Sequence, residues 1–256
     1  MKIFLRKTSL VDYPGHVSSV IFFSGCNLRC PWCQNGDLVL GKETGDLIGV
    51  DESLAHIRKR QQVLGGVVLS GGEPCLWEGL PDLVAEIKKL QLLVKLDTNG
   101  LFPAMLEKLF DREETRPDYI ALDLKIAPSR YGELKEPAGK TPGKAPGIEA
   151  QNPNENSRAS GALIQSAALI RESGIMHEYR TLALPDGFIT EKDIEALAPL
   201  TDGAPWYFRL FRSGDCLDPA WNRQEEQEVE LDRSLKILAQ TLAEKAKKLG
   251  KNGIIP

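Results

Sequence analysis

Short apolar runs rich in β-branched residues alternate with longer amphipathic segments through most of this 256-residue chain. Runs of this kind are typical of strands, and they occupy residues 17–23, 66–70, 92–97, 119–125, 178–184 and 206–211. Repeated β–α units favour a parallel sheet with helices outside it, either open or curled toward a barrel. The predicted fold class is therefore α/β, and ligands in such folds bind at the carboxyl ends of the strands.

The segments between these runs have helical periodicity. Apolar residues recur on one face within residues 80–90 and 162–173, and a long closing helix is expected over 231–249. Residues 135–160 interrupt the pattern, because they combine Pro, Gly, Lys and Asn with almost no large apolar residue. We expect a single domain, 1–256, with a flexible surface insertion at 135–160 that is inert or, alternatively, a lid or docking loop.

Composition excludes several classes of protein. The net charge of -4 is unlike that of a general nucleic-acid binder. No apolar run approaches the length that crosses a bilayer, and the first seven residues have no long apolar core of the signal-peptide kind. We therefore expect no nucleic-acid or membrane partner and a cytoplasmic location, where thiols stay reduced.

Three of the five cysteines, Cys26, Cys30 and Cys33, lie within eight positions directly after the first predicted strand. In a reducing compartment, clustered cysteines more often bind metal than form disulfides. Three thiolates can bind three irons of a cubane cluster and leave the fourth iron open to a substrate, as a catalytic zinc keeps one position free. The alternatives are a buried thiol cluster, a disulfide with one spare cysteine, or a zinc site completed by a distant ligand.

A second motif, Ser-Gly-Gly-Glu-Pro, ends the strand predicted at 66–70. Gly71 and Gly72 allow the backbone to come close to a ligand. Glu73 offers a carboxylate, and Pro74 fixes the turn. An ordinary turn is the alternative, but a strand-end position in the same chain as the three cysteines favours a site.

The two motifs together resemble the radical S-adenosylmethionine enzymes, in which a C-x3-C-x-aromatic-C loop holds a 4Fe–4S cluster. The resemblance implies a partial (β/α)6 barrel of parallel strands, with S-adenosylmethionine bound at the open iron. It also implies that the Gly-Gly-Glu-Pro strand end binds the amino group of this cofactor. The resemblance assigns Cys26, Cys30 and Cys33 to the cluster, and to cofactor binding Trp32, Gly71, Gly72, Glu73, Pro74, Thr98, Asn99, Lys125 and Arg180.

Two more strand ends, Leu-Asp-Thr-Asn-Gly and Leu-Asp-Leu-Lys, resemble those of the activating enzymes for glycyl radical enzymes. The resemblance implies that Lys125 pairs with the S-adenosylmethionine carboxylate, and that Asp97, Thr98 and Asp123 hold a monovalent cation. By charge alone, the two aspartates would repel each other unless a cation or Lys125 lay between them. The alternative is that Asp97 and Asn99 only cap a turn.

Arginines occur on the last two predicted strands. Arg180, if it points into the barrel, needs an anionic partner, and the resemblance suggests the S-adenosylmethionine carboxylate or ribose region. The alternative is an outward-facing arginine in a solvated pair. Arg209 and Arg212 are weaker candidates for a similar place.

The opening stretch at residues 7–15 resembles the anaerobic ribonucleoside-triphosphate reductase activating proteins. The resemblance implies an enzyme that makes a 5′-deoxyadenosyl radical and abstracts hydrogen from a glycine of a partner glycyl radical enzyme, with a flavodoxin or ferredoxin as electron donor. Pyruvate formate-lyase or another glycyl radical enzyme could be that partner. The sequence is also compatible with a radical S-adenosylmethionine enzyme acting on a small molecule of the deazapurine type, and with a zinc-binding interaction module.

Overall fold

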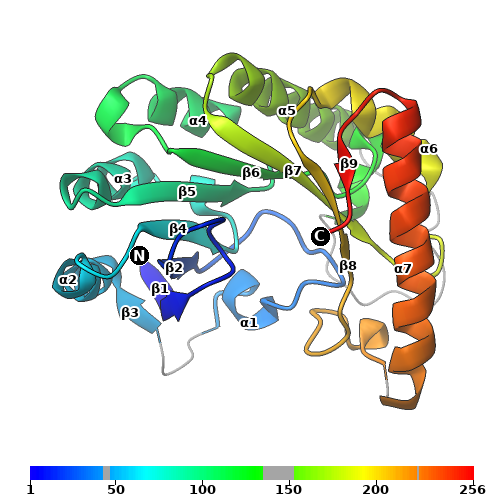
Figure 1. Cartoon of the computed structure of the whole chain (residues 1–256), viewed down its shortest axis with the longest axis horizontal. Helices are drawn as coiled ribbons and strands as arrows, with labels where there is room; N and C mark the ends of the chain where they lie inside the picture. Colours follow the sequence, from blue (N-terminus) through cyan, green and yellow to red (C-terminus); the bar gives the residue numbers. More distant parts are fainter. Residues whose placement is uncertain (43–46, 135–152, 224) are drawn as a thin grey trace.

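The computed structural model describes residues 1–42, 47–134, 153–223 and 225–256. In this part of the chain, nine strands form one sheet in the order β3-β1-β2-β4-β5-β6-β7-β8-β9. Figure 1 shows the sheet curving from β3 to β9, with most of the helices on its outer side. The strands are β1 (Lys2–Ser9), β2 (Ser18–Phe23), β3 (Leu47–Gly49), β4 (Gly66–Gly71), β5 (Leu93–Thr98), β6 (Tyr119–Asp123), β7 (Met176–Ala183), β8 (Trp206–Leu210) and β9 (Gly253–Ile254).

Seven α-helices accompany these strands in the described residues. They are α1 (Gly36–Val39), α2 (Val50–Arg60), α3 (Leu80–Lys89), α4 (Pro103–Phe110), α5 (Pro153–Glu172), α6 (Glu191–Leu197) and α7 (Glu225–Lys248). Short 3-10 helices are η1 (Pro74–Leu76), η2 (Glu113–Thr115), η3 (Pro128–Leu134), η4 (Ala198–Leu200) and η5 (Pro219–Trp221). No helix in the described ranges is both long and apolar enough to span a bilayer.

The centre of the sheet is parallel. β2 pairs with β4, and β4 to β8 follow in chain order, each parallel to the one before. All six predicted strands are therefore confirmed, and their carboxyl ends meet at one edge of the sheet. The α/β class is confirmed as well, with a linear strand order that leaves the described sheet open, as a partial barrel requires.

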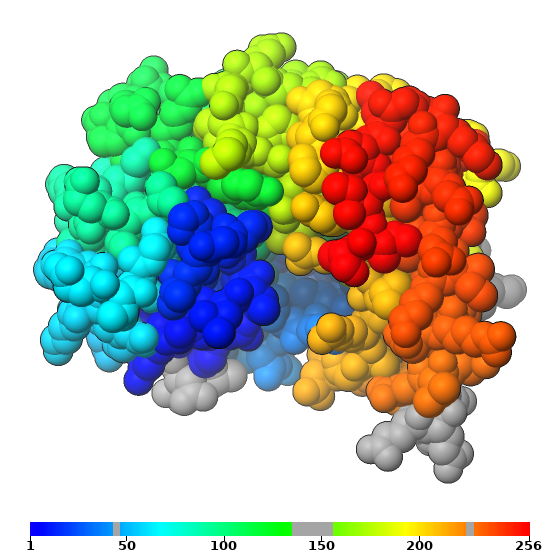
Figure 2. Space-filling model, viewed as in Figure 1, coloured from blue at the N-terminus to red at the C-terminus, as the bar shows by residue number. Residues whose placement is uncertain are grey.

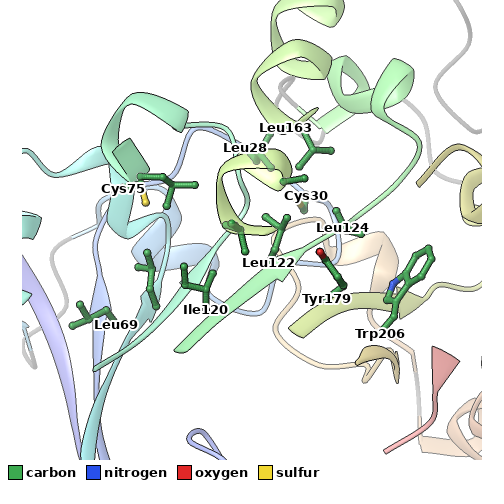
Figure 3. Close-up of a cluster of buried hydrophobic side chains, with 14 of the residues drawn as sticks. Leu28, Cys30, Leu69, Cys75, Ile120, Leu122, Leu124, Leu163, Tyr179 and Trp206 are labelled. Carbon is green, nitrogen blue, oxygen red and sulfur yellow. The ribbon is translucent and has the colours of Figure 1, made fainter. Parts of the chain in front are cut away.

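The outer face of the sheet carries the main core. Alternate strand residues pack there against the helices, and burial of this apolar surface is the dominant stabilising term in a domain of this size. Figure 3 shows part of this core and places Cys30 beside Leu28 and Leu163, near Leu122 and Leu124. The loop that carries the three cysteines is thus anchored in the core through its middle cysteine.

The inner face of the sheet is mixed in character. A small apolar cluster that includes Tyr13, Val20 and Val68 occupies its amino-terminal end. The charged inner residues come from β5, β6, β7 and β8, and they are Lys95, Asp97, Asp123, Glu178, Arg180 and Arg209. Charges held inside a barrel must pair with one another or with a ligand.

Three features of the fold differ from the sequence-based expectations. β1 and β3 add an antiparallel extension to one side of the sheet, and β9 adds a parallel strand to the other, none of which was predicted. Residues 153–160, expected to be part of the flexible insertion, form the first turns of α5. Ser157 and Arg158 are exposed there and Ala159 is buried, so these turns need no apolar periodicity. Residues 135–152 of the insertion lie outside the described residues.

Candidate functional site

The cysteine loop leaves the carboxyl end of β2 and ends at the short helix α1. Cys30 is buried, whereas Cys26 and Cys33 are partly exposed, and all five cysteines are free thiols. Two N–H groups face the sulfur of Cys26: Leu28 N at 3.4 Å and Asn99 Nδ2 at 3.9 Å. Donors directed at a sulfur suit a thiolate that binds iron. The disulfide alternative is wrong for this structure.

Burial sets the protonation state of the loop without metal. It raises the pKa of Cys30 to about 12, although Lys125 acts in the opposite direction. Burial also raises the pKa of Cys26. Because metal ligands must be thiolates, a metal bound by these thiols would displace their protons.

A segment from the far end of the chain closes over the cysteine loop. Leu217 N donates to Cys33 O at 2.8 Å, and Asp218 N donates to Pro31 O at 2.9 Å. Trp32, which the resemblance assigns to the cofactor, is buried against the rings of Phe188 and Trp221, with centroids 5.0 and 5.4 Å away. Trp32 therefore also fixes the loop to this segment.

The Gly-Gly turn at the end of β4 lies directly against the start of the cysteine loop. Gly72 N donates to Phe23 O and Glu73 N to Gly25 O, both at 2.9 Å. A Cβ atom on Gly72 would lie 1.9 Å from Gly25 O, and one on Gly71 would lie 2.4 Å from Phe23 N. The sequence argument expected a ligand to require these glycines, whereas in the structure the protein's own backbone already requires them.

Glu73 is buried and holds the neighbouring strand end. Its carboxylate accepts hydrogen bonds from Thr98 Oγ1 and Asn99 N, each at 2.8 Å, and from Cys75 N at 3.0 Å. Asn99 in turn donates to Asn27 Oδ1 at 2.8 Å, beside Cys26. Burial raises the pKa of Glu73, and the three hydrogen bonds oppose that shift. Glu73, Thr98 and Asn99 thus link the ends of β4 and β5 to the cysteine loop.

A charge network crosses the next strands. Arg180 bridges the two predicted aspartates: its Nε lies 2.8 Å from Asp123 Oδ1, and its Nη1 lies 3.2 Å from Asp97 Oδ2. Lys125 pairs with Asp123 at 3.2 Å, and Lys95 pairs with Asp97. Arg180 thus points into the barrel rather than outward.

The network controls the ionisation of both aspartates. Burial alone would raise the pKa of Asp97 and of Asp123, but the charges of Arg180 and of the adjacent lysine outweigh it and hold both pKa values below the usual range. The pKa of Lys125 is raised because Asp123 outweighs its burial. Both carboxylates are therefore ionised at neutral pH.

The resemblance placed a monovalent cation beside Asp97, Thr98 and Asp123, and these three side chains have protein partners in the structure. The positive charge between Asp97 and Asp123 is the Arg180 guanidinium, and Thr98 Oγ1 is bonded to Glu73. Within the described ranges, no three His, Cys, Asp or Glu side chains converge as ligands of one metal ion. The cation site stays a prediction.

A cavity of about 470 Å³ joins these parts of the molecule. Its walls include all three cysteines, the Gly-Gly-Glu turn and the charged strand ends of β5 to β7. The cavity also reaches residues that sequence analysis did not assign to the site, among them Asp12, Gln34, Asn35, Ser70, Leu182 and Phe211. Figure 2 shows the molecule hollowed between the N-terminal strands and the C-terminal end of the chain. Thiols at one end and paired charges along the wall fit a cluster with a charged, chelating cofactor beside it.

Comparison with known proteins identifies the family. Residues 20–145 match the family model described as the Radical SAM superfamily. The chain is 30% identical over 220 residues, 84% of its length and 81% of the relative's, to a Methanocaldococcus jannaschii protein named "Putative glycyl-radical enzyme activating enzyme". The chain belongs to the radical S-adenosylmethionine superfamily. It is therefore an enzyme that uses a 4Fe–4S cluster and S-adenosylmethionine, and the zinc-module alternative is wrong.

Other radical S-adenosylmethionine relatives match a smaller part of the chain. It is 32% identical over 47% of its length to a pyruvate formate-lyase-activating enzyme of Clostridium pasteurianum, of which it covers 50%. It is 39% identical over 36% of its length to a 7-carboxy-7-deazaguanine synthase of Hyperthermus butylicus, of which it covers 38%.

A solved structure, anSMEcpe with bound AdoMet, supports the fold. It superposes on 91% of this chain with a TM-score of 0.55 at 15% identity, and the chain covers 61% of it. At this identity the likeness concerns the fold alone.

Proposed function

We propose that this enzyme activates a glycyl radical enzyme, and that its partner is anaerobic ribonucleoside-triphosphate reductase. The observation that carries the proposal is the similarity to a protein named as a glycyl-radical enzyme activating enzyme, which extends over 84% of the chain. The resemblance of residues 7–15 to the reductase activating proteins supports the choice of partner.

The three cysteines would hold the cluster by three irons. The bound cluster and S-adenosylmethionine supply a 5′-deoxyadenosyl radical, after one electron from a flavodoxin or ferredoxin. Asn99 would direct its Nδ2–H at the sulfur of Cys26, and the Leu217 and Asp218 amides would hold the loop's geometry. The protein's part is thus to position the groups and to keep solvent away from them.

The strand-end charges would bind the amino-acid end of S-adenosylmethionine. Lys125 and Arg180 are cations on the cavity wall, and each keeps donors beyond those used with Asp123. We propose that they pair with the carboxylate, and that the backbone of Gly71 and Gly72 together with Glu73 faces the amino group. Because Glu73 already accepts three hydrogen bonds, its contribution there would be mainly its charge.

An electron paramagnetic resonance experiment tests the proposal. The cluster-loaded protein is reduced anaerobically and mixed with S-adenosylmethionine. One sample then receives anaerobic ribonucleoside-triphosphate reductase, and a second sample receives pyruvate formate-lyase. A glycyl doublet on the reductase is expected. A doublet only on the lyase would change the partner, and no doublet on either enzyme would overturn the activase proposal.

The small-molecule alternative rests on the similarity to 7-carboxy-7-deazaguanine synthase, which covers 36% of the chain. A turnover assay for a deazapurine product, analysed by mass spectrometry, separates it from the activase. Product formation without any glycyl signal would favour this alternative.

A further inference from the structure

Glu178 is a buried residue, and one of its two carboxylate oxygens accepts no hydrogen bond from the described residues. It projects from β7 into the barrel and is 2% exposed. Its Oε2 accepts a hydrogen bond from Tyr119 Oη at 2.8 Å. Oε1 is also buried, and no hydrogen-bond donor among the described residues reaches it. An acceptor left unpaired in this way has a cost that a bound donor would remove.

Arg209 is the charged group nearest to that oxygen. Its Nη2 lies 3.5 Å from Glu178 Oε1, close enough for charge attraction but outside hydrogen-bond geometry. Arg209 lines the cavity, and its side chain is 47% exposed. A guanidinium carries five N–H donors, so Arg209 retains donors that can turn toward the cavity.

The pair lies in the same barrel as the proposed cofactor site. Glu178 and Arg180 are two positions apart on β7 and share its inner face, and Arg209 is paired with Leu182 of β7 in the β7–β8 register. Arg209 lines the cavity, whereas Glu178 lies behind it and outside the cavity lining, so a bound segment reaches Glu178 Oε1 only when the exposed Arg209 side chain turns aside.

We propose that Arg209 and Glu178 bind a main-chain peptide group of the protein substrate. A peptide group offers one carbonyl acceptor and one N–H donor, the complement of an arginine donor beside an unpaired carboxylate oxygen. Arg209 donates to the carbonyl and Glu178 Oε1 accepts from the N–H, while Tyr119 holds the carboxylate in place. Recognition through the backbone suits a glycine target, which has no side chain. The proposal rests on the activase function proposed above.

The test uses cluster-loaded protein and peptides. The ligand is an eight-residue peptide centred on the radical glycine of anaerobic ribonucleoside-triphosphate reductase, together with copies N-methylated at one residue at a time. Binding is measured by anaerobic calorimetry with S-adenosylmethionine present and no reductant. The variants are Arg209→Met and Glu178→Gln, with the exposed Arg233→Met on α7 as matched control.

Each site variant is expected to weaken peptide binding about tenfold, which corresponds to one hydrogen bond to a charged group. One of the N-methylated peptides should bind the wild type about tenfold more weakly than the unmodified peptide does. Glu178→Gln should bind that N-methylated peptide and the unmodified peptide with equal affinity. The control Arg233→Met should bind the peptide as the wild type does and should keep the wild-type rate of S-adenosylmethionine cleavage without peptide.

Two results would overturn the proposal: wild-type peptide affinity in both site variants, or equal affinity of the wild type for every N-methylated peptide. Loss of S-adenosylmethionine cleavage in both variants would instead assign the pair to the cofactor and would also overturn it. Failure of the activase function is recognised separately, because the wild type itself would then form no glycyl radical on any partner.

Discussion

Arg180 binds carboxylates from two neighbouring strands, so its removal would leave two partly buried carboxylates, each with one lysine partner. We expect Arg180→Met to lower the free energy of unfolding at pH 7 by about 1.5–3 kcal/mol, the range for losing a hydrogen bond to a charged group. Urea denaturation of the cluster-free protein measures the change. Arg112→Met is the control, since Arg112 and Glu114 form an exposed pair, and it should change stability little.

The pairing of Arg180 with Asp97 and Asp123 also makes the free energy of unfolding depend on pH. Because the pKa values of Asp97 and Asp123 are lowered in the folded protein, the stabilisation is present above the unfolded pKa of about 3.9 and is lost as the pH falls toward the folded values. The difference between wild type and Arg180→Met should therefore be largest near neutral pH and shrink below about pH 4. A constant difference from pH 7 to pH 3 would contradict this account.

Glu73 gives a second prediction at the residue scale. In Glu73→Gln an NH2 group must face one of three donors, Thr98 Oγ1, Asn99 N or Cys75 N. We expect a loss of about 1–3 kcal/mol in the free energy of unfolding. Glu78→Gln, at an exposed position five residues away, should stay within about 0.5 kcal/mol of wild type. Equal effects of the two substitutions would show that the buried hydrogen bonds are not what Glu73 contributes.

The proximity of Asp97, Asp123 and Lys125 could be predicted from the sequence, because the carboxyl ends of parallel strands lie at the same edge of a sheet. The sequence also contained an unused signal: Lys95 stands two positions before Asp97 on β5 and hence on the same face. That Arg180 lies between the aspartates could not be predicted, since long side chains choose partners only when the strands are packed.

At the scale of elements, the joint between β4 and the cysteine loop is the most restrictive contact. A methyl group on Gly72 would collide with Gly25 O, so Gly72→Ala must displace the loop. We expect a loss of about 1–3 kcal/mol of stability from overpacking, together with lower iron and sulfide content after anaerobic reconstitution. Iron content at the wild-type level would contradict the role given to this joint.

Gly161→Ala is the matched control for that substitution. Gly161 lies within α5, and a Cβ there meets no atom within 4 Å. Alanine is favoured over glycine inside a helix by about 0.5–1 kcal/mol, so this variant should be slightly more stable and should keep its iron.

The central strands were predictable because β2, β4 and β6 contain short apolar runs, whereas β5, β7 and β8 alternate buried apolar residues with polar or charged ones. β1 was not, since Ile3 and Ser9 are its only buried residues and it pairs through its backbone at the side of the sheet. β9 has two residues, too few for any periodicity, and depends on contact with β8. Strands of this kind are determined by long-range pairing rather than by local pattern.

For the whole molecule, the cluster is expected to be dispensable for folding, because the main core lies on the outer face of the sheet. The triple variant Cys26→Ala, Cys30→Ala and Cys33→Ala should lose its iron and visible absorbance and keep its far-ultraviolet circular dichroism. Its cluster-free stability should fall by only about 1–2 kcal/mol. Cys75→Ala removes a buried thiol outside the loop and should keep the iron. A triple variant without secondary structure would contradict this expectation.

The late segment that closes over the cysteine loop also bears on when the loop gains its final geometry. Gln34 of the loop donates a hydrogen bond to Arg212 O of this segment, 178 positions further along the chain. The backbone bonds from Leu217 and Asp218 to the loop come from the same late segment. During synthesis the three cysteines emerge early and wait, without this support, until β8 and the segment after it have been made. We therefore expect maturation with iron and sulfide to follow synthesis of β8 and the segment after it.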